Sequence, residues 1–135
     1  IKAIMLKIDC NGSSAGTGYA IYHEITELKK KFHKPVIALV ENICASGGYW
    51  IACATDHIIA PSTAIVGSIG VTFQYLFEFP KLLEQYNIGY NSIAAGKYKA
   101  IGDHFKTMTD DEKALLQSVI DDTYEQFTQS VAQSR

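Results

Sequence analysis

The sequence predicts an α/β domain built on a parallel sheet, on the basis of three observations. Residues 2–9 (KAIMLKID) form a β-branched, apolar run that ends in turn residues, as a strand does. Residues 36–40 (VIALV) form a second, uninterrupted apolar run, typical of a strand that helices cover on both faces. An amphipathic segment with helical spacing lies between them. The order strand, helix, strand predicts a right-handed parallel crossover.

The first helix is predicted to follow the turn residues 10–14 (CNGSS) and to end before Pro35. Three lysines, at positions 29–31, fall in its last turn, where cations suit the helix dipole. We expect this basic end to be solvated. The apolar stripe of this helix consists of Ile21, Ile25, Leu28 and Phe32.

The second half of the chain continues the alternation of strands and helices. The patterns predict a helix that follows the serine of the SGG at 46–48 and runs through residue 54, a strand at 57–60, a tight segment at 67–71 (GSIGV), a helix at 80–86 and a strand at 90–94. Residues 109–112 (TDDE) form a capping box that opens a long closing helix. The apolar face of this helix carries Leu116, Ile120, Tyr124, Phe127 and Val131. An α/β layered domain accounts for this order.

Composition and charge exclude several classes of protein. The chain has 135 residues, 47% of them hydrophobic and 19% charged, which suits one compact domain rather than a disordered chain. A net charge of −2 without a basic block argues against nucleic-acid binding. No window reaches the roughly 18 apolar residues of a membrane span. The three cysteines form no CxxC pair, so we expect neither a disulfide framework nor a zinc site.

The start of the chain suggests a fragment. The first residue is Ile1 rather than methionine, and the chain begins inside a predicted strand. We therefore expect residues 1–135 to be a single domain of a longer protein, with the preceding segment and the flanking strands missing.

The segment ASGGYW (residues 45–50) is the strongest candidate for chemistry. Ser46 is predicted at the end of a strand and the start of a helix, where its hydroxyl lies near unpaired backbone N–H groups that can stabilise an oxyanion. The Gly47 amide, directly after the serine, is the usual position for one such donor. The same Ser-Gly-Gly pattern also suits a plain helix N-cap, so the motif alone leaves both interpretations open.

A serine nucleophile needs a base, and the sequence offers histidines and lysines. His104, beside Asp103, is the histidine that we keep as a candidate, since the others suit exposed or structural positions. A lysine can replace histidine where an apolar, hydroxyl-rich pocket favours the neutral amine. Lys99 is suited to this role because no Asp or Glu lies within three residues on either side, and Lys97 is its rival.

Four ordered blocks resemble the signal peptide peptidase A family, membrane-bound bacterial serine peptidases with a Ser/Lys dyad. The blocks are ASGGYW (45–50), ATD (54–56), GSIGV (67–71) and GKYK (96–99). The resemblance extends over nearly the whole chain. It implies the fold shared by Clp protease and crotonase, a β-β-α superhelix of parallel-sheet units, with residues 1–135 as one peptidase domain.

The resemblance also implies the roles of individual residues. The family's nucleophile falls on Ser46, its general base on Lys99, and the serine that orients the lysine on Ser68. The oxyanion hole is implied at the amides of Gly47 and Gly12. The loop departs from the family's Ser-Pro-Gly-Gly, since residues 10–13 are Cys-Asn-Gly-Ser, with Asn11 in place of proline and Ser13 in place of the second glycine.

By resemblance, the substrates are signal-peptide remnants and other unfolded or membrane-associated peptides. The family forms homo-oligomeric rings with sites shared between subunits, and it is anchored in the bacterial cytoplasmic membrane with its catalytic domain outside the cytoplasm. The apolar segment 75–79 (YLFEF) fits a subunit contact, a groove for apolar substrate or a plain core role. No metal or cofactor is implied.

Three alternatives remain open at the level of sequence. The altered residues 11–13 suit a catalytically silent scaffold that binds peptide or protein. The same fold, with its paired amides, suits an acyl-thioester enzyme of the crotonase type, which does not need Lys99. A Clp-like Ser/His/Asp peptidase would use His104 as the base.

Overall fold

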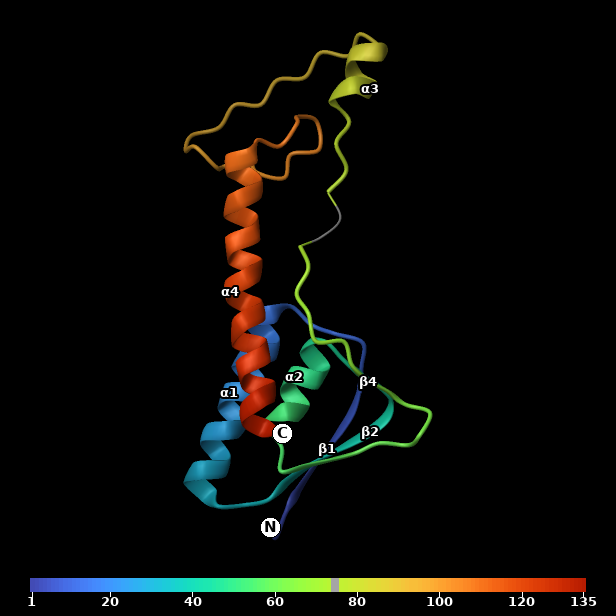
Figure 1. Cartoon of the computed structure of the whole chain (residues 1–135), viewed down its shortest axis with the longest axis vertical. Helices are drawn as coiled ribbons and strands as arrows, with labels where there is room; N and C mark the ends of the chain where they lie inside the picture. Colours follow the sequence, from blue (N-terminus) through green and yellow to red (C-terminus); the bar gives the residue numbers. More distant parts are fainter. Residues whose placement is uncertain (74–75) are drawn as a thin grey trace. The chain divides into compact units, whose positions relative to one another are not determined.

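The computed structural model describes residues 1–73 and 76–135, which form two compact units (Figure 1). Unit 1 comprises Ile1–Val71 and Asp122–Arg135, and unit 2 comprises Thr72–Asp121.

Unit 1 contains a parallel sheet of four strands, which confirms the predicted α/β class. The strands are β1 (Ile4–Cys10), β2 (Val36–Ala45), β3 (His57–Ile59) and β4 (Ile65–Gly67). The central strand β2 pairs with β1 along one edge and, along the other, with β3 near its start and β4 at its end, always in parallel. The carboxyl ends of β1, β2 and β4 therefore meet at one end of the sheet.

Two helices cover one face of this sheet. Helix α1 (Ala15–Phe32) begins at Ser14, whose hydroxyl accepts a hydrogen bond from Thr17 N at 3.3 Å. Helix α2 (Gly47–Cys53) lies between α1 and the strands (Figure 1). The core under α2 consists of Ile8, Ala38, Val40, Cys44 and Ala52.

The other face of the sheet is open. Side chains alternate between faces along a strand, and the register puts Met5, Leu39 and Ile59 on the face away from α2. Met5 and Ile59 are more than half exposed. The apolar run of β2 predicted that helices cover both faces of this strand. Among the described residues, helices cover only one face.

The basic end of α1 differs from the prediction at one lysine. Lys29 Nζ lies 2.7 Å from Asp56 Oδ1 and donates to the Ala54 carbonyl at 2.9 Å, so this cation is paired rather than solvated. Asp56 also accepts a hydrogen bond from Val36 N at 2.7 Å. The spacing of the lysines could not reveal this, because Asp56 reaches Lys29 through the fold. Lys30 forms only an exposed pair with Glu27.

Helix α4 (Asp110–Ser134) begins with the predicted capping box. Thr109 N donates to Glu112 Oε2 at 2.9 Å, and Glu112 N donates to Thr109 Oγ1 at 3.2 Å. Its last part belongs to unit 1, where the Phe127 ring stacks on Trp50 with centroids 4.5 Å apart. Phe127 is thus a core residue, as its place on the apolar face predicted.

Unit 2 contains the short helix α3 (Pro80–Gln85), as predicted, but no strand over residues 90–94. A strand needs a partner, and none of the described residues pairs with this segment. Instead, the Tyr90 ring packs on Phe105 with centroids 5.1 Å apart, its hydroxyl donates to Asp103, and Ile93 is fully exposed. The prediction of a strand over residues 90–94 is therefore wrong.

Candidate functional site

Ser46 occupies a strained turn between β2 and α2. Its backbone has φ 51° and ψ −123°, a region that costs a residue with a side chain about 1–3 kcal/mol. Its side chain makes no capping hydrogen bond, which argues against the plain N-cap interpretation. Its N–H donates to the Gly67 carbonyl at 2.8 Å, and its carbonyl accepts from Trp50 N at 2.9 Å. The neighbouring strand β4 and the helix α2 thus hold the Ser46 backbone in place, while the Ser46 hydroxyl makes no capping bond.

The loop after β1 lies directly against this turn. A Cβ atom on Gly12 would lie 3.4 Å from Ser46 Cβ and 3.7 Å from Ser46 Oγ. A Cβ atom on Gly47 would overlap the Ser13 hydroxyl and lie 2.9 Å from Ser13 N. Both glycines named as oxyanion-hole candidates therefore lie beside Ser46, and Gly47 has no room for a side chain.

Ser13, which stands where the family has its second glycine, fits into the structure of the loop. Its hydroxyl donates to the Ser14 carbonyl at 3.0 Å. A Cβ atom on Gly18 of α1 would lie 3.1 Å from this hydroxyl and 3.3 Å from Gly47 Cα. The absence of side chains at Gly18 and Gly47 thus leaves the space that Ser13 fills. Gly12 has φ 151°, a value that favours glycine.

Ser68 lies at the same end of the sheet as Ser46. It follows Gly67, which pairs with Ala45 in the register of β4 with β2, just as Ser46 follows Ala45. It is exposed and has φ 56°, so both serines named from the sequence have a backbone conformation that is uncommon outside glycine. The glycines around Ser68 indicated a tight segment but not this strain.

Lys99 belongs to unit 2 and is exposed. It lies in a turn, where its N–H donates to the Gly96 carbonyl at 3.2 Å, rather than after a strand as predicted. Over the part of the chain that the structure describes, no ion pair involves Lys99. Its rival Lys97 forms an ion pair with Asp111 at 3.0 Å, and the side chains of Tyr98 and Asp111 raise the pKa of Lys97. Lys97 is therefore the poorer candidate for a base.

His104 also belongs to unit 2 and has a structural partner. Its Nδ1 lies 2.8 Å from the Phe77 carbonyl, which can only accept, so Nδ1 carries the proton. Asp103 does not orient this imidazole. Its carboxylate accepts instead from the Tyr90 hydroxyl and from Phe105 N, and these bonds hold the pKa of Asp103 below its usual range. A triad through Asp103 and His104 finds no support in this geometry.

One polar contact near Ser46 was not singled out from the sequence. The Asp9 carboxylate, at the end of β1, accepts hydrogen bonds from Asn42 Nδ2 and from Ile43 N, each at 3.1 Å. An acidic residue that ends an apolar strand directly before a turn is a signal for such a contact, but the partner strand cannot be identified from local sequence.

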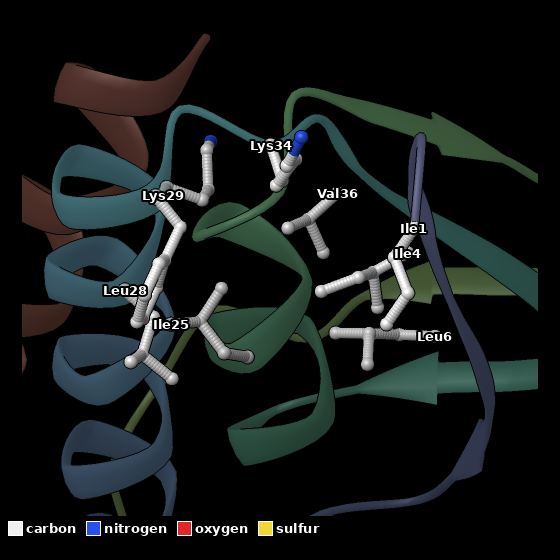
Figure 2. A pocket seen from close by; sticks show the side chains of 9 residues that line it. Ile1, Ile4, Leu6, Ile25, Leu28, Lys29, Lys34 and Val36 are labelled. Atoms are coloured by element: carbon white, nitrogen blue, oxygen red, sulfur yellow. The ribbon is translucent and has the colours of Figure 1, made fainter.

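Unit 1 also contains an apolar cavity, and Figure 2 shows the side chains that line it. It has a volume of about 460 Å³ and lies between α1 and the amino ends of β1 and β2, with Ile25, Leu28 and Phe32 of the predicted stripe in its wall. Ser46, Gly12 and Ser68 follow the carboxyl ends of the strands, at the opposite end of the sheet.

Residues 1–73 and 76–135 show neither a metal-binding cluster nor a membrane-spanning helix. No cluster of three His, Cys, Asp or Glu side chains there is placed to hold a metal ion. None of the helices there has both the length and the apolar character needed to cross a bilayer.

Comparisons with known proteins place the chain in a family. The sequence profile described as Peptidase family S49 matches residues 28–135. A protein of Methanocaldococcus jannaschii that is named as a candidate protease is 38% identical over 135 residues. The match covers 100% of this chain and 42% of that protein. Protease 4 of Haemophilus influenzae is 31% identical, over 100% of this chain and 22% of that protein. The chloroplastic serine protease SPPA of Arabidopsis thaliana is 33% identical, over 99% of this chain and 20% of that protein.

The chain spans less than half the length of these relatives. The profile covers most of it, including Ser46, Ser68 and Lys99. The resemblance drawn from the four motif blocks is confirmed at the level of the family: the chain belongs to peptidase family S49.

Proposed function

We propose that the protein containing this chain is a serine endopeptidase with Ser46 as nucleophile, Lys99 as general base and Ser68 as the residue that orients the lysine. One observation carries the proposal. Ser46 is held at a strained strand-to-helix turn with its side chain free of the cap, and both Gly12 and Gly47 lie against it. Strain of this kind, kept where a hydroxyl faces backbone amides, is typical of a nucleophile.

The proposed reaction has two halves. Neutral Lys99 takes the Ser46 proton as Ser46 Oγ attacks a peptide carbonyl, and the resulting oxyanion accepts hydrogen bonds from the Gly47 and Gly12 amides. Protonated Lys99 then donates its proton to the leaving amine as the C–N bond breaks. Water, deprotonated by the same lysine, releases the acyl group from Ser46 and restores the hydroxyl.

The surroundings of Lys99 support a shared site. A lysine base must be neutral, which requires burial away from carboxylates, yet Lys99 is exposed in the single chain. The unit that carries Lys99 exposes large apolar side chains such as Tyr86, Ile88 and Ile93. We infer that a second copy covers this surface, as in a homo-oligomeric ring in which one subunit supplies Ser46 and its neighbour supplies Lys99.

Substrate and location are proposed from the family resemblance. The substrates are signal-peptide remnants and other unfolded or membrane-associated peptides. The protein acts at the bacterial cytoplasmic membrane, with the catalytic domain outside the cytoplasm and the anchor in a segment other than the one described. Exposed Phe77 and Phe79 suit an apolar subunit contact or an apolar peptide, while Tyr75 of the same segment lies outside the described residues.

The test is hydrolysis of a fluorogenic apolar peptide by the full-length protein and its variants. Ser46→Ala and Lys99→Ala should each be inactive, and the two variants, unfolded and reassembled together, should regain part of the activity. A Lys99→Ala protein with near-normal rates would reject the dyad. If His104→Ala were then inactive, a Ser/His mechanism would replace it, whereas an inactive wild type would favour a peptide-binding scaffold.

A further inference from the structure

Asp9 lies where the register between β1 and β2 changes. Up to Ile8, each β1 residue pairs with the residue 32 positions later, so that Ile8 faces Val40. Beyond the irregularity, Cys10 faces Cys44, an offset of 34. One residue of β1, Asp9, therefore spans three residues of β2, positions 41–43, and β2 bulges there.

This bulge brings the oxyanion loop to the nucleophile. Gly12 follows Cys10 by two residues, and Ser46 follows Cys44 by two, so the shifted offset of 34 places Gly12 opposite Ser46. The short contact between the two residues, 3.4 Å from a Cβ on Gly12 to Ser46 Cβ, agrees with this register. Under the earlier offset, Gly12 would face Cys44, and Ser46 would lie beyond reach of the Gly12 amide.

The Asp9 carboxylate holds the bulge. Its two oxygens accept from Asn42 Nδ2 and from Ile43 N, two of the three bulged residues. These bonds also lower the pKa of Asp9. An Asp side chain is ionised at neutral pH in any case, and a charged acceptor makes the stronger hydrogen bond. The third bulged residue, Glu41, forms only a solvent-exposed pair with Lys7, and such pairs contribute little.

We propose that Asp9 is a positioning residue of the active site: by fixing the β2 bulge, it keeps the Gly12 amide opposite the Ser46 hydroxyl. Asp9 takes part in no step of the reaction. This inference rests on the proposed function, because it gives the bulge a role through the oxyanion hole.

The experiment compares variants of the full-length protein by kcat and KM for the fluorogenic peptide and by thermal unfolding. Asp9→Ala removes both hydrogen bonds and should lower kcat by about 10- to 100-fold, with KM changed by less than about twofold. The reason is that a displacement of about 1 Å in a catalytic group can lower the rate by about 100-fold. Asn42→Ala removes one bond and should have a smaller effect of the same kind.

Asp9→Asn is the conservative variant. Its amide oxygen still accepts from Ile43 N, and the Asn42 amide can turn to present its own oxygen to the new Nδ2 group. We therefore expect Asp9→Asn to keep kcat within about threefold of the wild type.

Asp56→Ala is the matched control. Asp56 also binds a β2 backbone N–H, that of Val36, but at the amino end of the strand, away from Ser46. This variant should lower the unfolding midpoint at least as much as Asp9→Ala and leave kcat unchanged.

Three results would overturn the proposal. Asp9→Ala with wild-type kcat, beside an inactive Ser46→Ala, removes the role of Asp9 and leaves the nucleophile in place. Equal losses of kcat in Asp9→Ala and Asp56→Ala show a general effect on folding instead. A fully active Ser46→Ala overturns the proposed function itself, and the positioning role with it.

Discussion

The unit that carries Ser46 and the unit that carries Lys99 differ in what they bury by themselves. Unit 1 has a core under α2, a Trp50–Phe127 stack with rings 4.5 Å apart and several fully buried side chains. Among the described residues of unit 2, Glu112 alone is buried. Large apolar side chains in unit 2 remain exposed, to 65% at Phe77 and to 102% at Ile93.

This difference separates the two halves of the proposed mechanism. The strained backbone at Ser46 persists only where the surrounding structure compensates for it, and unit 1 supplies that structure from its own residues. A neutral lysine needs an apolar environment, which unit 2 does not supply for Lys99. The nucleophile is therefore prepared within one chain, whereas the base depends on the second copy that we propose.

The largest expected effect is on the stability of unit 1. Phe127→Ala removes a buried ring from the Trp50 stack and should lower the free energy of unfolding by about 3–5 kcal/mol. Phe77→Ala, at an exposed ring of unit 2, should change it by less than about 0.5 kcal/mol in the unassembled chain. Urea unfolding followed by Trp50 fluorescence measures both. Equal losses of unfolding free energy in the two variants would contradict the proposed difference between the units.

The next effect is on catalysis. Gly47→Ala places a Cβ atom against the Ser13 backbone, with 2.9 Å to Ser13 N, and must displace the loop that carries Gly12. Loss of an oxyanion donor typically costs about 100- to 1,000-fold in kcat, and we expect a loss in that range. Gly16→Ala is the control, because a Cβ there meets no atom within 4 Å. Peptide hydrolysis measures both, and an active Gly47→Ala would show that the Gly12 loop is not required.

The sequence predicted those features that depend on short-range patterns. The apolar runs located β1 and the first part of β2, the turn residues 10–14 and the TDDE box located the starts of α1 and α4, and ASGGYW located the turn at Ser46. Features that depend on distant partners were not predictable in this way. The strand expected at 90–94 fails because no strand pairs with it, and Lys29 is paired because the fold brings Asp56 to it.

The same distinction between local patterns and distant partners applies to the candidate site. Ser46, Gly47 and Gly12 could be named from motifs, but their mutual contact depends on a register change that Asp9, Asn42 and Ile43 stabilise between two strands. No pattern within either strand contains that information. The catalytic roles of all five site residues stay predictions: Ser46, Gly47, Gly12, Ser68 and Lys99.

A smaller effect concerns assembly. Ile93 is fully exposed in the single chain, so Ile93→Ser should leave the free energy of unfolding unchanged. If a second copy covers Ile93, the substitution should weaken self-association by about tenfold, which corresponds to about 1.4 kcal/mol of binding free energy. Ser92→Ala, at the neighbouring position, is the control. Light scattering over a dilution series measures the mass. An unchanged mass for Ile93→Ser, or a monomeric wild type, would contradict the shared site.

The smallest effect is a pH dependence confined to the start of α4. The Lys106 ammonium, which donates to Glu112 at 2.7 Å, and the Thr109 N–H lower the pKa of Glu112 from 4.5 to about 2. A carboxylate with a lowered pKa stabilises the folded state fully above its ordinary value, and this contribution is lost as the pH falls from 4.5 towards 2. The protection of the amide N–H groups of residues 110–113, taken relative to their intrinsic exchange rate at each pH, should therefore fall over that interval, which hydrogen exchange followed by NMR detects. In Glu112→Gln, whose side chain cannot titrate but whose amide oxygen can still accept from Thr109 N, the protection should lack this dependence on pH. If the pH dependence is retained in that variant, another carboxylate is responsible, and the ionisation of Glu112 does not stabilise the start of α4.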